Sequence, residues 1–236
     1  MFEKDQNSHT FTAQASSDAA IKTGIEPTFF GKVMSFFALA VLLSAGGTYL
    51  TMTYFIQYFI EMPWLMYAFF AVELVIIFSS RVWSKKRPLN RILFAAFAII
   101  TGITIAPLIS VLLASPAGTS ILIKALMATG CMFSATALIG YTTKYDLSGM
   151  RGFLFMSLIG MIIVSVIGIF MPWGNTFELV FSGIGVILFS AFTMYDFQKI
   201  KSYPQDRYID AALHLYLDIF NLFLYILRFI MSLSRD

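Results

Sequence analysis

The chain has 236 residues, of which 58% are hydrophobic and only 12% are charged, whereas about a quarter of the residues in a soluble domain are charged. The net charge of +3 is small, so we expect no nucleic-acid partner. The single cysteine, Cys131, excludes an internal disulfide framework. This much apolar surface is suited to a lipid bilayer, and the composition predicts an all-α, polytopic membrane protein.

Residues 1–30 are polar and mixed in charge. They lack the basic region followed by an early apolar run that marks a secretory signal peptide. We therefore expect a flexible cytosolic tail, followed over residues 31–236 by one helical membrane domain.

A membrane-spanning helix needs about 20 mainly apolar residues. By this criterion the sequence predicts a seven-helix bundle. A six-span variant, in which the last segment is re-entrant, stays open because Arg228 and Arg235 would then lie on the cytosolic side. The predicted spans are 33–57, 63–82, 91–114, 121–141, 152–172, 177–198 and 208–231.

Lysine and arginine are enriched in the loops on the cytosolic side of a membrane. Here they gather in the N-terminal tail and in the links that follow the second, fourth and sixth spans. The sequence therefore predicts a multi-pass membrane protein with a cytosolic N-terminus.

The third span contains the stretch "TGITIAPL". Gly102 and Pro107 weaken a helix, which a membrane helix tolerates where neighbouring helices satisfy the freed carbonyls. A packing kink and a functional hinge are both compatible with this stretch.

The last span carries a polar stripe. At about 100° per residue, its polar side chains fall within one sector of the helix. Lipid would not accept such a stripe, so we expect the last helix to lie at the centre of the bundle and to line a hydrated path. The stripe consists of Asp210, His214, Asp218, Asn221, Tyr225 and Arg228.

Two aspartates occupy the last two spans, Asp196 near the end of the sixth and Asp218 within the seventh. The short link 199–207 makes these spans antiparallel neighbours. If the two carboxyls are close, they cannot both ionise easily, and they titrate as a unit. The pair then suits a pH switch, a cation site or an acid–base catalyst, whereas two separate structural carboxyls are the alternative.

Three other ionisable residues have candidate roles. Glu73 lies in the middle of the second span, where inserting a carboxylate costs about 2.5–3.5 kcal/mol, so a functional role is the default hypothesis. Glu73 suits the wall of a cation path. Asn221 in the polar stripe suits the same role. Arg81 could pair with Asp196 or extend toward lipid headgroups. His214 lies one turn before Asp218 and either tunes the pair or is a simple hydrogen-bond partner.

The stretches "MYDFQKIK" and "YIDAALHLYLDIFNLFLYILRFI" resemble the C-terminal signature of the Bax-inhibitor family, the transmembrane Bax inhibitor motif proteins. "GYTTKYDLSGMRGFLFMSLIG" and "TGITIAPLIS" are similar to the middle spans of its bacterial members. The C-terminal motif is specific, and the middle spans are weaker evidence by themselves. One departure is Phe197, where the family more often has a threonine after the Tyr-Asp pair.

The resemblance implies a seven-helix bundle with a central last helix, in a bacterial inner membrane. It also implies a pH-sensitive calcium leak, with more leak at acid pH. The family's paired aspartates, its pH sensor and calcium-binding groups, correspond to Asp196 and Asp218. Its second-span glutamate corresponds to Glu73, and its latch arginine, less securely, to Arg81.

Two other classes stay open. Intramembrane aspartyl proteases also use two aspartates on adjacent spans, but their Gly-x-Gly-Asp motif is replaced here by "LYLD". The second class is a non-conducting adaptor that binds other membrane proteins, such as a membrane protease. We expect a channel rather than an enzyme, with the lipid bilayer and calcium ions as partners and no cofactor other than calcium as the permeant ion.

Overall fold

The computed structural model describes residues 28–171 and 173–234, and every regular element in these ranges is a helix. The tail predicted for residues 1–30 falls almost entirely outside them. The helices are α2 (Phe29–Leu50), η1 (Thr51–Phe55), α3 (Ile56–Glu61), α4 (Trp64–Phe78), α5 (Ser80–Trp83), α6 (Leu89–Leu113), α7 (Gly118–Thr142), α8 (Met150–Phe170), α9 (Asn175–Ile200) and α10 (Tyr208–Leu233).

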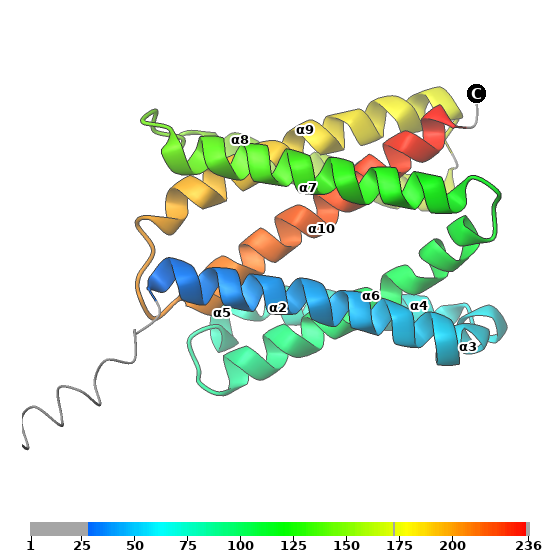
Figure 1. The fold of residues 1–236 in the computed structure, drawn as a ribbon, viewed down its shortest axis with the longest axis horizontal. Coiled ribbons are helices and arrows are strands. Elements are labelled where there is room, and N and C mark those ends of the chain that lie inside the picture. The colour runs from blue at the N-terminus through cyan, green and yellow to red at the C-terminus, as the bar shows by residue number, and fades with distance from the viewer. Residues whose placement is uncertain (1–27, 172, 235–236) are drawn as a thin grey trace, which may run out of the picture.

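Six helical stretches in the described ranges are long and apolar enough to cross a membrane, the first being the continuous run Phe29–Glu61. The all-α, polytopic fold class is therefore confirmed. Figure 1 shows that α2 begins at one end of the bundle and α10 ends at the other. With 26 residues, α10 crosses the whole bundle, so the re-entrant alternative for this segment is not what the structure shows.

The second predicted span, 63–82, is not one helix. α4 has 15 residues, about 22 Å at 1.5 Å per residue, which is short for a full span, and α5 follows after a break at Ser79. The Ser79 hydroxyl donates to the carbonyls of Val75 at 2.6 Å and Ile76 at 3.1 Å, and such back-bonding bends helices. The indole of Trp83 donates to the Ile76 carbonyl at 3.0 Å, which satisfies an acceptor at the break.

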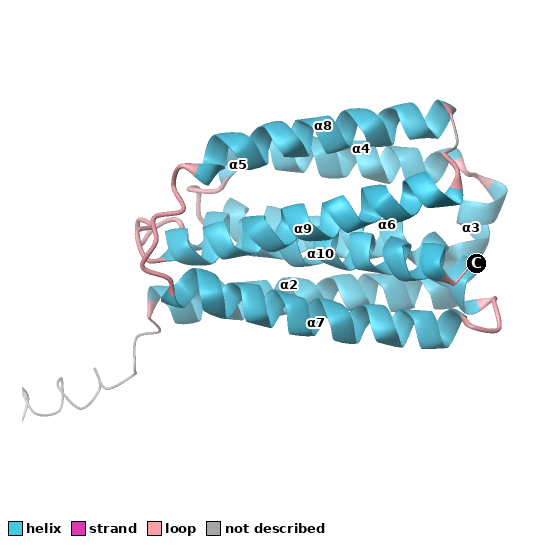
Figure 2. Cartoon of the chain, turned by 90° about the horizontal axis from the view of Figure 1, so that it is seen from above, coloured by secondary structure: helices cyan, strands magenta, loops and turns pink. Residues whose placement is uncertain are grey.

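The last helix is central, as predicted. α10 packs against α2, α6, α7 and α9, whereas α4 packs mainly on α6 and α8 mainly on α9. Figure 2 shows α10 enclosed between neighbouring helices along its length. Leu215, Leu222 and Leu227 on this helix are completely buried. Other helices therefore cover most of α10, including Asp218.

Helices α2 and α6 approach closely where glycines face the opposite backbone. A Cβ on Gly47 would lie 2.7 Å from the carbonyl oxygen of Ile99, and one on Gly102 would overlap the carbonyl oxygen of Ser44. Thr48 donates to the Gly102 carbonyl at 2.9 Å. α6 remains one helix through Pro107, so Gly102 serves close helix packing here.

Candidate functional site

The two predicted aspartates lie together in the interior. Asp196 is in the last two turns of α9 and Asp218 is in the third turn of α10, and the link 201–207 makes these helices antiparallel neighbours. Their exposed fractions are only 5% and 4%. Carboxyls this buried need a partner, because desolvation of an isolated carboxylate is very unfavourable.

The side chains of Asp196 and Asp218 are within hydrogen-bonding reach of one another. A carboxylate is acceptor-only when it is ionised, so a bond between two carboxyls requires a proton on one of them. Oδ2 of Asp218 is buried and has no hydrogen-bond partner among the described residues. A direct bond within the pair would therefore need one shared proton.

A histidine and a lysine lie near the Asp196 end of the pair. His214 Nδ1 lies 3.7 Å from Asp196 Oδ2, and Lys199 is near enough to act on the Asp196 charge. The ammonium of Lys199 is held 5.6 Å from the ring centre of Tyr195 and 5.0 Å from that of Tyr203. The His214 side chain is 45% exposed, so this end of the pair is not sealed by neighbouring helices.

Tyr203, in the link between α9 and α10, closes the same cluster. Burial raises the pKa of its phenol, and the negative charges of Asp210 and Asp196 raise that pKa further. The phenol therefore keeps its proton and donates to Asp210 Oδ2 at 3.3 Å. This bond fixes the link against the first turn of α10.

Glu73 belongs to a different polar cluster. It is buried on α4 and accepts a hydrogen bond of 2.6 Å from Thr104 on α6. Its charge acts on Tyr216, whose buried hydroxyl lies beside the side chains of Ser44 and Thr101. Tyr216 is about 160° around α10 from Asp218 at 100° per residue. Glu73 thus lies on the opposite side of α10 from the carboxyl pair.

Two further predicted residues do not contact the pair. Arg81 is exposed on α5, and in the part of the chain that the structure describes it forms no ion pair with Asp196. Asn221 is half-buried on α10 and donates to the Leu217 carbonyl at 2.8 Å. The latch role of Arg81 and the ion-path role of Asn221 stay predictions.

Residues 26–235 match the sequence profile of the Bax1-I family, described as "Inhibitor of apoptosis-promoting Bax1". The chain belongs to this family. An uncharacterised protein of Helicobacter pylori (strain J99) is 35% identical over 204 residues, 86% of each chain. An uncharacterised protein of Campylobacter jejuni is 29% identical over 235 residues, 99% of this chain and 98% of that one. The inner membrane protein YbhL of Escherichia coli (strain K12) is 34% identical over 173 residues, 66% of this chain and 69% of YbhL.

In this member of the Bax1-I family, sequence reasoning missed residues that complete both clusters. Lys199 follows Asp196 by three positions, and residues at this spacing lie on one helix face. That spacing could have identified it. Thr104 and Tyr216 carried no such signal, because their partner Glu73 is on another helix.

The metal-ligand role of Asp196 and Asp218 stays a prediction. Calcium takes about six to eight oxygen ligands. Across residues 28–171 and 173–234 no group of three or more histidine, cysteine, aspartate or glutamate side chains is placed to hold a metal ion.

Proposed function

We propose that this Bax1-I family protein is a pH-sensitive, calcium-permeable leak channel of a bacterial inner membrane, and that Asp196 and Asp218 sense protons. The observation that carries the proposal is the buried contact between two carboxyls on α9 and α10. A position that serves only packing needs no ionisable side chain, whereas ionisable residues inside a membrane bundle mark ion and proton pathways.

The pair with one shared proton keeps one negative charge. That charge attracts His214, at 3.7 Å, and Lys199, and this attraction holds α9 and the start of α10 together. A second proton neutralises the pair and ends the attraction, while a charged His214 and Lys199 then repel one another. The seam between α9 and α10 loosens, and the leak increases at acid pH.

The neighbours of the pair change one part of the expected mechanism. In this proposal His214 and Lys199, rather than Arg81, hold the charge of the pair, because His214 lies 3.7 Å from Asp196 and Lys199 is close to it. Arg81 acts as a latch in this proposal only in a second state, in which α5 moves toward α9. The proposed orientation puts the N-terminus, Arg81 and the link 201–207 in the cytosol.

Replacing Glu73 by glutamine is expected to lower calcium flux and to keep its pH dependence. Glu73 provides a buried carboxylate oxygen on the opposite side of α10 from the proton-sensing pair. Glutamine keeps the bond from Thr104 and removes the charge that attracts a divalent cation. Flux into dye-loaded liposomes measures both quantities. Glu61→Gln, at the exposed end of α3, is the control and should leave flux unchanged; equal loss in both variants would exclude Glu73 from the path.

The proposal is tested by reconstituting the purified full chain in liposomes that contain a calcium dye and recording flux across pH. Flux that rises toward acid pH supports the leak. A paired-aspartate site would also suit hydrolysis of a membrane peptide, so the same liposomes should contain a labelled membrane peptide. Cleavage without flux would support an intramembrane protease, and neither activity would support an adaptor.

A further inference from the structure

Two arginines converge on one tyrosine at the end of the bundle where α6 and α10 begin. Nε and Nη2 of Arg91 donate to the Tyr208 hydroxyl at 3.1 Å and 3.0 Å, and the Arg91 guanidinium lies 5.7 Å from the ring centre of Phe36. The Arg87 guanidinium lies 5.1 Å from the Tyr208 ring centre, and that of Arg91 lies 6.0 Å from it. Two like charges are thus held on one buried ring.

Neither arginine has a carboxylate partner within the ranges that the structure describes. The nearest acids along α10 and the preceding link are Asp206, which is exposed, and Asp210, which accepts from Tyr203. Unpaired like charges this close repel, and a site of this kind is stabilised by an anion. A guanidinium has five N–H donors, and Arg91 uses two of them on Tyr208, so further donors remain for a ligand.

The local backbone favours an anion as well. α6 begins at Leu89 and α10 at Tyr208, and neither N-terminus is capped by a side chain. The N-terminus of a long helix carries a partial positive charge and free N–H groups. The first turn of α6 contains no acidic residue, whereas that of α10 contains Asp210.

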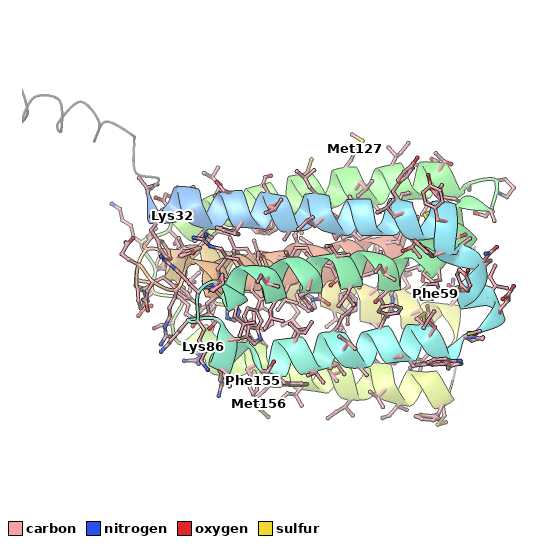
Figure 3. The ribbon with its side chains drawn as sticks, turned by 90° about the horizontal axis from the view of Figure 1, so that it is seen from below. Lys32, Phe59, Lys86, Met127, Phe155 and Met156 are labelled. Atoms are coloured by element: carbon pink, nitrogen blue, oxygen red, sulfur yellow. The ribbon has the colours of Figure 1, made fainter. Side chains whose placement is uncertain are left out.

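This end of the bundle is also basic and at the membrane boundary. Lys85 and Lys86 are exposed in the link that joins α5 to α6. Figure 3 shows Lys86 and Lys32 at the same end of the helices. Since the link precedes α6, which is long and apolar enough to cross a membrane, we expect it at the depth of lipid headgroups.

We propose that Arg87, Arg91 and Tyr208 form a binding site for the phosphate headgroup of an anionic phospholipid. Arginine suits this ligand because its planar fork matches a phosphate with two parallel hydrogen bonds. The bound lipid joins the starts of α6 and α10, because Arg91 is on the first and Tyr208 on the second.

The test is thermal unfolding of the full-length protein in detergent with added dioleoyl phosphatidylglycerol. Dioleoyl phosphatidylcholine and inorganic phosphate are titrated in parallel. Phosphatidylglycerol is expected to raise the Tm more than phosphatidylcholine or inorganic phosphate does. Arg87→Gln and Arg91→Gln should each increase the half-saturating lipid concentration about tenfold, the loss expected for a charge-assisted hydrogen bond. Arg87→Gln leaves the bonds to Tyr208 intact, so it tests the site even if Arg91→Gln fails to fold.

Lys144→Gln removes one exposed positive charge in the link between α7 and α8 and is the matched control. Its response to phosphatidylglycerol should equal that of the unmodified protein. Equal weakening in Lys144→Gln and the arginine variants would show a diffuse charge effect and overturn the site. Equal stabilisation by phosphatidylcholine, or by inorganic phosphate alone, would overturn its assignment to an anionic lipid.

Discussion

Replacing either Asp196 or Asp218 by asparagine is expected to flatten the pH dependence of calcium flux. Asparagine has the shape of a protonated aspartate and does not titrate. A one-proton switch changes the ratio of its two states about tenfold per pH unit, whereas flux through the variants should change less than about twofold over that interval. Flux of the purified variants in dye-loaded liposomes measures this.

The effects of the two substitutions on the pH dependence of calcium flux should not add. Two buried carboxyls this close are expected to titrate as one unit, so the double variant Asp196→Asn, Asp218→Asn should resemble either single variant. Asp206→Asn, in the exposed link before α10, is the control and should keep the original profile. A double variant with the original flux and pH profile would show that the pair is structural and that the mechanism is wrong.

Replacing Gly102 or Gly140 by alanine is expected to destabilise the bundle. A Cβ at Gly102 would overlap the Ser44 carbonyl oxygen on α2, and one at Gly140 would overlap the Met194 carbonyl oxygen on α9. Backbone atoms cannot rotate away as a side chain can. Overpacking costs about 1–3 kcal/mol, which exceeds the gain of about 1 kcal/mol that alanine gives over glycine in a helix.

Two other helical glycines provide matched controls. Cβ atoms at Gly46 and Gly130 would meet nothing within 4 Å. Gly46→Ala and Gly130→Ala should therefore leave the Tm unchanged or raise it, while Gly102→Ala and Gly140→Ala lower it. Thermal unfolding in detergent separates the two groups, and a common response would mean that α2–α6 and α7–α9 packing tolerates a methyl group at these positions.

The sequence was sufficient to predict the helices and the centre of the bundle. The polar stripe that includes His214 and Asp218 could not face lipid, so α10 had to be enclosed, as it is. The contact between Asp196 and Asp218 followed from a short link between two helices. The first inference used the periodicity of polar residues within one helix. The second used the short link between two helices that follow one another in the chain.

Contacts between distant helices were beyond such reasoning. Glu73 was expected in the wall of a cation path, but its neighbours could not be predicted: α4 packs on α6 and places it with Thr104, across α10 from Asp218. The break at Ser79 was also missed. The segment 63–82 is uniformly apolar, and the break depends on how Trp83 reaches the Ile76 carbonyl.

The central claim is that proton occupancy of the Asp196–Asp218 pair controls the leak. Infrared difference spectroscopy of the protein in lipid, titrated across pH, detects the protonated carboxyl band, and Asp196→Asn and Asp218→Asn assign it. The account predicts that this band titrates over the same pH interval as calcium flux in liposomes of the same lipid. A band that stays constant while flux changes with pH would contradict it.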